Sequence, residues 1–348
     1  MKTSPAPAIN TRMALLTDTH FGARKGSQLF HEYFQEFYEK RFFPELDRRS
    51  ITSVVHLGDC FDVRKGIDYW SLDWAKTNFF DPLRERGIHL TMIVGNHDIF
   101  YKNSLKINSP RLNLREYDNI TIIDSPQQID DILMVPWICE DNAQETFDVL
   151  ESTDAKYCMG HLELAGFYAN KEYKCDHGTD PNHFKKFQSV FSGHFHKKSS
   201  KGNITYLGNP YQMFWNDEGE TRGFHIFDTD TAELEFIPNP VSMFHKIYCR
   251  PGQLVNPTKY SNTFIKLIVE EGFTPIQTFN LVDSLYDEGC HDVKVIENIN
   301  TDIQEEIDVD MEDTLTTLTN YVNAMDSGLN KNNIMDIFKS LYIEAQEV

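Results

Sequence analysis

The chain has 348 residues, of which 40% are hydrophobic and 25% are charged, enough for one large domain and a smaller one. No apolar run approaches the length of a membrane-spanning helix, and the opening MKTSPAPAINTR contains no apolar signal segment. We therefore expect a cytoplasmic protein that does not enter membranes. Residues 1–12 are expected to form a flexible tail.

The six cysteines are widely spaced and contain no CxxC pair. This pattern indicates neither a disulfide framework nor a zinc knuckle. We expect reduced thiols at Cys60, Cys139, Cys158, Cys175, Cys249 and Cys290.

The net charge of −20 is unusual for a protein that binds nucleic acid. Acidic residues concentrate at 297–313, however, whereas basic residues gather at 64–65, 171–174, 185–186 and 197–201. A bound metal would add positive charge. Taken singly, each basic pair is more typical of an ordinary solvated face.

Apolar runs that end in small or polar residues recur along the first two thirds of the chain. Each is typical of a buried strand, and helix-like stretches at 28–43 and 69–86 separate the early ones. The alternation predicts an α/β fold, a β-sandwich flanked by helices, over residues 13–244. The expected strands are 13–17, 53–57, 90–94, 156–159 and 189–192.

The pattern changes after residue 244. A strand at 263–270, a helix at 275–287 and a strand at 291–297 predict a small βαβ capping or substrate-positioning domain over 245–297. An acidic linker is expected at 298–313 and helices at 314–348. The last helix would carry an apolar stripe of Ile334, Ile337, Phe338, Leu341 and Tyr342.

Polar residues with metal-binding side chains follow the expected strands. Asp18 and His20 in LLTDTHFG lie two apart, so both can point to one side, and Gly58 permits a tight turn that presents Asp59. Later strands end in Asn96 and His97, in His161, and in His194 and His196.

Together these side chains suit two divalent metals, which can clamp a phosphate and generate hydroxide near neutral pH. Donors of the Asp, His and Asn types favour Mn, Fe or Zn over a calcium cage. Singly, the motifs are weaker: an Asp-x-His pair is often a capped turn, and His161 alone is compatible with a structural histidine.

The series DTH, GDCFD, GNHD, GH and GHFH over residues 13–210 resembles the calcineurin-like metallophosphoesterase signature. Within that superfamily, GDCFDVRK and GNHD resemble the SbcD-type nucleases of double-strand-break repair, most closely their T-even bacteriophage members. The segment VPW at 135–137 and HLELAGFY at 161–168 support the nearer match. A phage-encoded protein would act in the cytoplasm of its bacterial host.

The resemblance implies one metal held by Asp18, His20, Asp59 and His196, and a second held by Asp59, Asn96, His161 and His194. It implies that His97 lies beside the scissile phosphate and assists the leaving group. Cellular members have a histidine where this chain has Asp62. We interpret Asp62 as a carboxylate that supports a ligand or caps the loop.

The implied activity is exonuclease action from 3′ to 5′ on duplex DNA with endonuclease action on single strands. It would use two divalent ions, with Mn expected in preference to Mg, Fe or Zn. The implied partner is an SbcC-type coiled-coil ATPase, which the stripe in the last helix would contact. A homodimer is also expected, through stretches 69–86 and 109–117 with Trp70, Trp74 and Phe79 facing the partner. Alternatively, these aromatic residues cover the sheet, and the terminal helix packs on its own domain.

Two other functions use the same signature. A phosphoprotein phosphatase or cyclic-nucleotide phosphodiesterase would need the same metals. The phosphatases typically show GDxxDRG and GNHE, whereas this chain has GDCFDVR and GNHD. A non-catalytic scaffold would be expected to have lost ligands, and none is missing here.

Overall fold

The computed structural model describes residues 10–168 and 174–297. The chain divides into two compact units, Met1–Ile296 and Glu297–Val348, and the elements below belong to the first, apart from the last residue of the final strand. The expected linker at 298–313, the helices at 314–348 and most of the expected tail lie outside the described residues. Within the described ranges, no helix combines the length and hydropathy needed to cross a membrane.

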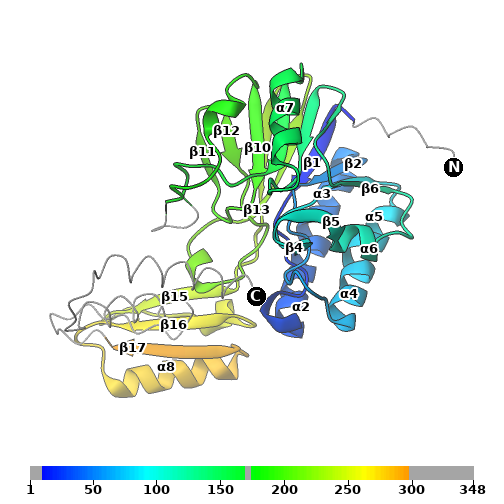
Figure 1. The fold of residues 1–348 in the computed structure, drawn as a ribbon. Coiled ribbons are helices and arrows are strands. Elements are labelled where there is room, and N and C mark those ends of the chain that lie inside the picture. Colours follow the sequence, from blue (N-terminus) through cyan, green and yellow to red (C-terminus); the bar gives the residue numbers. More distant parts are fainter. Residues whose placement is uncertain (1–9, 169–173, 298–348) are drawn as a thin grey trace, which may run out of the picture. The chain divides into compact units, whose positions relative to one another are not determined.

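Two six-stranded sheets form the centre of the fold (Figure 1). In the first sheet four adjacent strands on one side run parallel, and two strands that pair antiparallel complete the other side. Its order is β14 (Glu233–Pro238), β13 (Gly223–Asp228), β1 (Arg12–Leu16), β2 (Ser53–His56), β3 (His89–Ile93) and β6 (Ile120–Ile123).

The second sheet has a parallel centre and an antiparallel strand at each edge. Its order is β11 (Ser199–Lys201), β12 (Ile204–Tyr206), β10 (Ser189–Gly193), β9 (Tyr157–His161), β8 (Ile132–Val135) and β7 (Gln127–Ile129). The five strands expected from the sequence are confirmed as β1, β2, β3, β9 and β10.

The sandwich explains why its strands are apolar throughout. Side chains alternate between the two faces of a strand. In β1, Met13 and Leu15 join a buried cluster that also contains Met159 from the second sheet, whereas Ala14 and Leu16 join a cluster with the helices. Both faces of β1 are therefore buried, and a strand buried on both faces needs apolar residues at successive positions.

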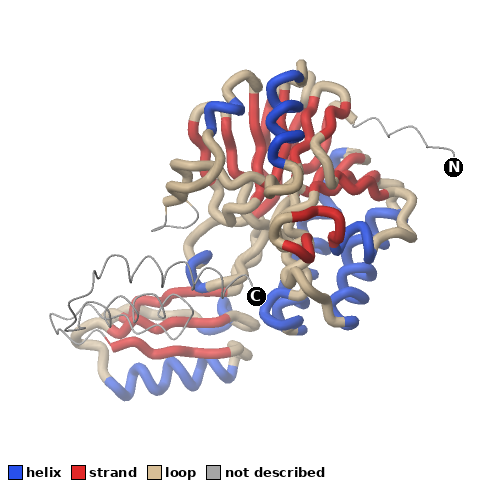
Figure 2. The backbone as a smooth tube through the Cα atoms, in the orientation of Figure 1, coloured by secondary structure: helices blue, strands red, loops and turns tan. Residues whose placement is uncertain are grey.

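Helices cover the outer face of the first sheet (Figure 2). One continuous run comprises α2 (Gln28–Phe37), a π-helical turn (Tyr38–Phe42) and α3 (Phe43–Arg49); another comprises α4 (Tyr69–Ala75), a π turn (Lys76–Phe80) and α5 (Asp81–Glu85). We expected the first to end at Phe43, and this was wrong. Proline lacks the N–H that the interior of an α-helix needs. A π turn comes directly before the segment that contains Pro44 and before the one that contains Pro82, and each helix continues past its proline.

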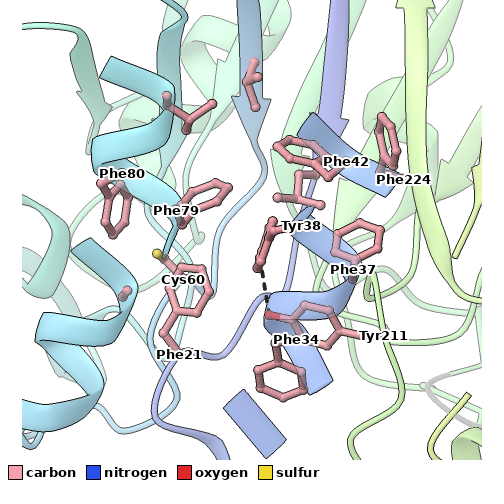
Figure 3. Packing of buried hydrophobic residues seen from close by; sticks show 14 of the residues in the cluster. Phe21, Phe34, Phe37, Tyr38, Phe42, Cys60, Phe79, Phe80, Tyr211 and Phe224 are labelled. Atoms are coloured by element: carbon pink, nitrogen blue, oxygen red, sulfur yellow. Dashed lines mark hydrogen bonds between the residues drawn. The ribbon is translucent and has the colours of Figure 1, made fainter. Parts of the chain in front are cut away.

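Aromatic side chains fill the space between these helices and the sheet (Figure 3). The rings of Phe34 and Tyr211 stack with centroids 3.8 Å apart. The Tyr211 hydroxyl donates to the carbonyl oxygen of Thr19 at 2.6 Å. Since Thr19 lies between Asp18 and His20, this core packs directly against the loop that carries the first two predicted ligands.

The predicted partner-facing role of Trp74 and Phe79 is wrong. Trp74 is 7% exposed and Phe79 is fully buried, and both rings pack around Phe21 beneath the helices. Burial against the sheet stabilises these large rings more than an exposed helix face would. Trp70 is 37% exposed and remains on the surface.

The second sheet is covered by α7 (Ala143–Ser152), whose Leu150 packs against Leu133 and Val190. The helix expected at 109–117 is shorter, with only Ser109–Asn113 helical as α6. The remaining elements of the sandwich are α1 (Ala23–Gly26), β4 (Ile99–Tyr101), β5 (Ser104–Asn108) and the 3-10 turns at Pro181–Phe184 and Trp215–Asp217.

After the sandwich, a three-stranded sheet has the order β15 (Phe244–Cys249), β16 (Phe264–Val269) and β17 (Asp292–Glu297). A 3-10 turn (Pro257–Tyr260) precedes β16, and α8 (Pro275–Asp287) connects β16 to β17. Leu285 of α8 packs with Leu267 in a separate small core. The predicted α/β sandwich followed by a βαβ element is therefore confirmed as a fold class.

Candidate metal centre

The predicted ligands follow five strands, three from one sheet and two from the other. β1, β2 and β3 are parallel neighbours, as are β9 and β10. Loops after parallel strands meet at one edge of a sheet. The side chains gathered there are Asp18, His20, Asp59, Asn96, His97, His161, His194 and His196.

The first group of donor atoms comes from Asp18, His20 and His196. The Nε2 atoms of the two imidazoles are 3.1 Å apart. They lie 4.0 Å and 3.9 Å from Oδ1 of Asp18, respectively. One cation between these three atoms could take the place of the contacts that the two rings and the carboxylate make with one another.

The second group comes from Asp59, Asn96, His161 and His194. Nε2 of His161 lies 3.1 Å from Oδ2 of Asp59 and 3.0 Å from Oδ1 of Asn96. The same amide oxygen is 2.9 Å from Nδ1 of His194. These contacts bring four possible donor atoms close together, which is the number that a tetrahedral metal site needs.

The loop of Asp59 is held by close backbone contacts. Gly58 has φ +99°, and a Cβ there would lie 2.4 Å from Nδ1 of His161, so only glycine fits. Oδ1 of Asp59 accepts the backbone N–H of His97 at 2.8 Å. The carboxylate is therefore fixed by the loop after β3 and faces a ligand from the second sheet.

Four of the predicted ligands have left-handed backbones. The φ angles are 50° at Asp18, 45° at His20, 54° at Asp59 and 84° at His194. Such a conformation costs a non-glycine residue about 1 kcal/mol or more, and it concentrates at functional sites. The loops therefore hold these side chains at some cost to stability.

Two imidazoles of the second group, those of His161 and His194, are each oriented through the other ring nitrogen. Nδ1 of His161 donates to the Leu57 carbonyl at 2.7 Å, and Nε2 of His194 lies 3.3 Å from Oε2 of Glu163. Partners of this kind fix ring orientation and tautomer in metal sites. The nitrogens left facing the site are Nε2 of His161 and Nδ1 of His194.

The charges of the site suit cations. Burial would lower the pKa of His20, but the hydrogen bond and charge of Asp62 and the charge of Asp59 raise it to about 9. Burial also opposes the charged form of His161, whereas Asp59 raises its pKa to about 9. The carboxylates thus stabilise positive charge on the neighbouring rings. They would equally stabilise divalent metal ions bound in place of those protons.

His97 and Asp62 occupy positions beside the first group. Nδ1 of His97 donates to the Asp62 carbonyl oxygen at 2.6 Å, so its Nε2 is directed elsewhere. The Asp62 carboxylate lies 3.1 Å from Nδ1 of His20. Asp62 thus supports a predicted ligand through its side chain and positions His97 through its backbone.

The sequence interpretation missed Asp98, although it lies in the GNHD motif. Its buried carboxylate accepts the backbone N–H groups of Asp59 at 2.9 Å and Gly95 at 2.9 Å. It also accepts those of Cys60 at 3.1 Å and Phe61 at 3.3 Å. The signal was present as the acidic residue of the motif, but three of its four backbone partners lie 37 to 39 positions away.

Two further residues were missed. Glu163 lies two positions after His161 but contacts His194, a ligand from the neighbouring strand. Arg64 was noted only as part of a basic pair, and its Nε donates to the Asn96 carbonyl at 2.8 Å. A guanidinium is thereby fixed beside the loop that carries Asn96 and His97.

Comparison with known proteins gives three findings. The sequence profile of the family described as calcineurin-like phosphoesterase matches residues 11–198. A protein of Enterobacteria phage T4 named exonuclease subunit 1 is 32% identical over 308 residues, which cover 86% of this chain and 89% of that protein. A solved structure described as a novel archaeal phosphodiesterase is 12% identical and covers 65% of this chain and 99% of its own, with a TM-score of 0.34, a similarity too low to carry an argument.

The hydrogen bonds of Asp98 lead to a prediction about stability. Asp98→Ala leaves four buried N–H groups without their acceptor, so we expect the free energy of unfolding to fall by about 3 kcal/mol or more. Metal content measured by elemental analysis should fall as well, because the Asp59 loop loses its support. Asp118→Ala, at an exposed aspartate, is the matched control and should change stability by less than about 0.5 kcal/mol. Equal urea denaturation midpoints for the two variants would contradict the role assigned to Asp98.

Proposed function

We propose that this chain, which belongs to the calcineurin-like phosphoesterase family, is a two-metal DNA nuclease. The observation that supports this proposal is the presence of two donor groups, one formed by Asp18, His20 and His196 and the other by Asp59, His161 and His194. The similarity to a phage exonuclease subunit over 86% of this chain favours DNA over other phosphate esters.

The donors fit two metals with one shared ligand. We assign Asp18, His20, Asp59 and His196 to the first metal, and Asp59, Asn96, His161 and His194 to the second. Two divalent ions in such a site supply hydroxide near neutral pH and neutralise charge on a phosphate. Manganese is the metal that we propose, because the donors are imidazole, carboxylate and amide oxygen without thiolate.

The protein groups around the metals have separate tasks. His97 has Nδ1 occupied by the Asp62 carbonyl, so the proton for the leaving oxygen would be carried on Nε2. Arg64 would bind a phosphate of the substrate strand, since its guanidinium is fixed next to Asn96. The region 245–297 would position DNA, and we propose 3′ to 5′ exonuclease action on duplex DNA with endonuclease action on single strands.

The proposal is tested with substrates of different classes. The purified protein with manganese should degrade end-labelled duplex and single-stranded DNA and should hydrolyse p-nitrophenyl phosphate poorly. Asp59→Asn should lower the nuclease rate at least about 100-fold, because both metals lose a shared anionic ligand. Retention of most activity in Asp59→Asn would refute the site, whereas efficient monoester hydrolysis without DNA cleavage would indicate a phosphatase.

His97 is expected to act on substrate and not on metal. His97→Ala should therefore keep wild-type metal content in elemental analysis while lowering the turnover number by about 100-fold, the usual size of a proton-transfer contribution. His183→Ala, at an exposed histidine, should change neither quantity. Loss of metal from His97→Ala in parallel with loss of turnover would show that His97 is a ligand.

A partner subunit is also proposed. The phage relative is named as a subunit, and the predicted stripe Ile334, Ile337, Phe338, Leu341 and Tyr342, which lies outside the described residues, would contact an SbcC-type coiled-coil ATPase. Deletion of residues 330–348 should preserve manganese-dependent cleavage of short DNA and weaken ATPase binding in a pull-down. Normal binding by the truncated chain would exclude this docking site.

Self-association is a separate proposal. Tyr69 is 90% exposed and Trp70 is 37% exposed at the start of α4, and they leave an aromatic surface beside the helices that cover the first sheet. A homodimer could bury it. Sedimentation velocity over micromolar concentrations tests this, because a single species of 40.5 kDa would exclude the dimer.

A further inference from the structure

A second kind of donor cluster lies beside the proposed two-metal centre. Donor atoms of Glu163, Cys175 and His177 all lie within 4.8 Å of one another. Oε1 of Glu163 is 3.3 Å from Nε2 of His177 and 3.7 Å from Sγ of Cys175. Carboxylate, imidazole and thiol are three different ligand types, and none of the three residues belongs to the ligand sets assigned above.

The backbone holds the segments of this cluster together. Thr179 donates its N–H to the Glu163 carbonyl at 2.7 Å, and Cys175 donates to the Phe167 carbonyl at 2.8 Å. A Cβ on Gly178 would lie 2.6 Å from the Glu163 carbonyl oxygen, so this close approach requires glycine. The three donors are therefore positioned by paired segments and not by chance contact of long side chains.

The thiol of Cys175 is 1% exposed and lies among the carboxylate and imidazole donors of the cluster. Burial and the charge of Glu163 raise the pKa of this thiol, whereas the backbone N–H groups of His177 and Gly178 oppose the rise. The free thiol therefore keeps its proton, and a metal bound beside it would displace that proton. His177 is 65% exposed, so one side of the cluster faces water.

We propose that Glu163, Cys175 and His177 form a third metal site that binds zinc. Thiolate and imidazole favour zinc over manganese or magnesium, so this site would select a different ion from the two-metal centre. On binding, the Cys175 thiol loses its proton to water, and a water molecule completes four ligands on the exposed side. The proposal does not depend on the nuclease function.

Glu163 connects the third site to the two-metal centre. Its Oε1 belongs to the cluster, whereas its Oε2 lies 3.3 Å from Nε2 of His194. A metal on Oε1 would fix the carboxylate and with it the orientation of the His194 ring. A metal at the third site would therefore also help to position His194, one of the residues assigned to the two-metal centre.

Cobalt spectroscopy separates this site from the others. The full chain is first loaded with manganese and then titrated with Co²⁺, which gives an intense near-ultraviolet charge-transfer band only when a thiolate is a ligand. The two-metal centre has no cysteine ligand, so a band would report a thiolate site alone. We expect one equivalent of Co²⁺ to produce the band and added Zn²⁺ to remove it.

Variants assign the band to this cluster. Cys175→Ser should abolish it, whereas Cys139→Ser, at a half-buried thiol in another cluster, should retain it. His177→Gln, at an exposed position that tolerates change, should weaken Co²⁺ affinity by at least about tenfold. Absence of the band in the wild-type chain, or its persistence in Cys175→Ser, would overturn the proposal.

Discussion

The buried carboxylate of Asp59 is the group around which the rest of the site is arranged. A charge removed from water needs partners of opposite charge or hydrogen-bond donors. Asp59 receives an N–H from His97 and faces the ring of His161, and therefore joins loops from both sheets. The hydrogen bonds of Asp98 hold the Asp59 loop, and the aromatic core supports the neighbouring loop of Asp18 and His20 through the contact of Tyr211 with Thr19.

Much of this arrangement followed from the sequence because strands buried on both faces are apolar throughout, and the ligands come directly after them. The features that could not be predicted from the sequence also have physical reasons. The pattern did not show that the helix starting at Gln28 would continue past Pro44 through a π turn. Nor did the pattern show that Trp74 and Phe79 would face the sheet. An apolar residue on a helix is compatible both with the protein's own core and with an interface to a partner subunit.

The residues that support the ligands were harder to predict than the ligands. Glu163 contacts a histidine that follows another strand, and Asp98 accepts backbone N–H groups. Neither kind of contact produces a recognisable spacing of residue types in the sequence. His177 lies outside the metal-binding motifs of the sequence, yet the fold brings it to Glu163 and Cys175. Supporting contacts therefore require the tertiary structure.

The left-handed backbones at Asp18, His20, Asp59 and His194 restrict how this site can evolve. Aspartate, asparagine and histidine tolerate positive φ better than bulky or β-branched residues. Two independent requirements, coordination chemistry and backbone conformation, therefore select the same few amino acids at these positions. A descendant that changes its metal preference is restricted to exchanges among Asp, Asn, His and Gly there, and wider variation is open only at ligands such as His161, which lies at the end of a regular strand.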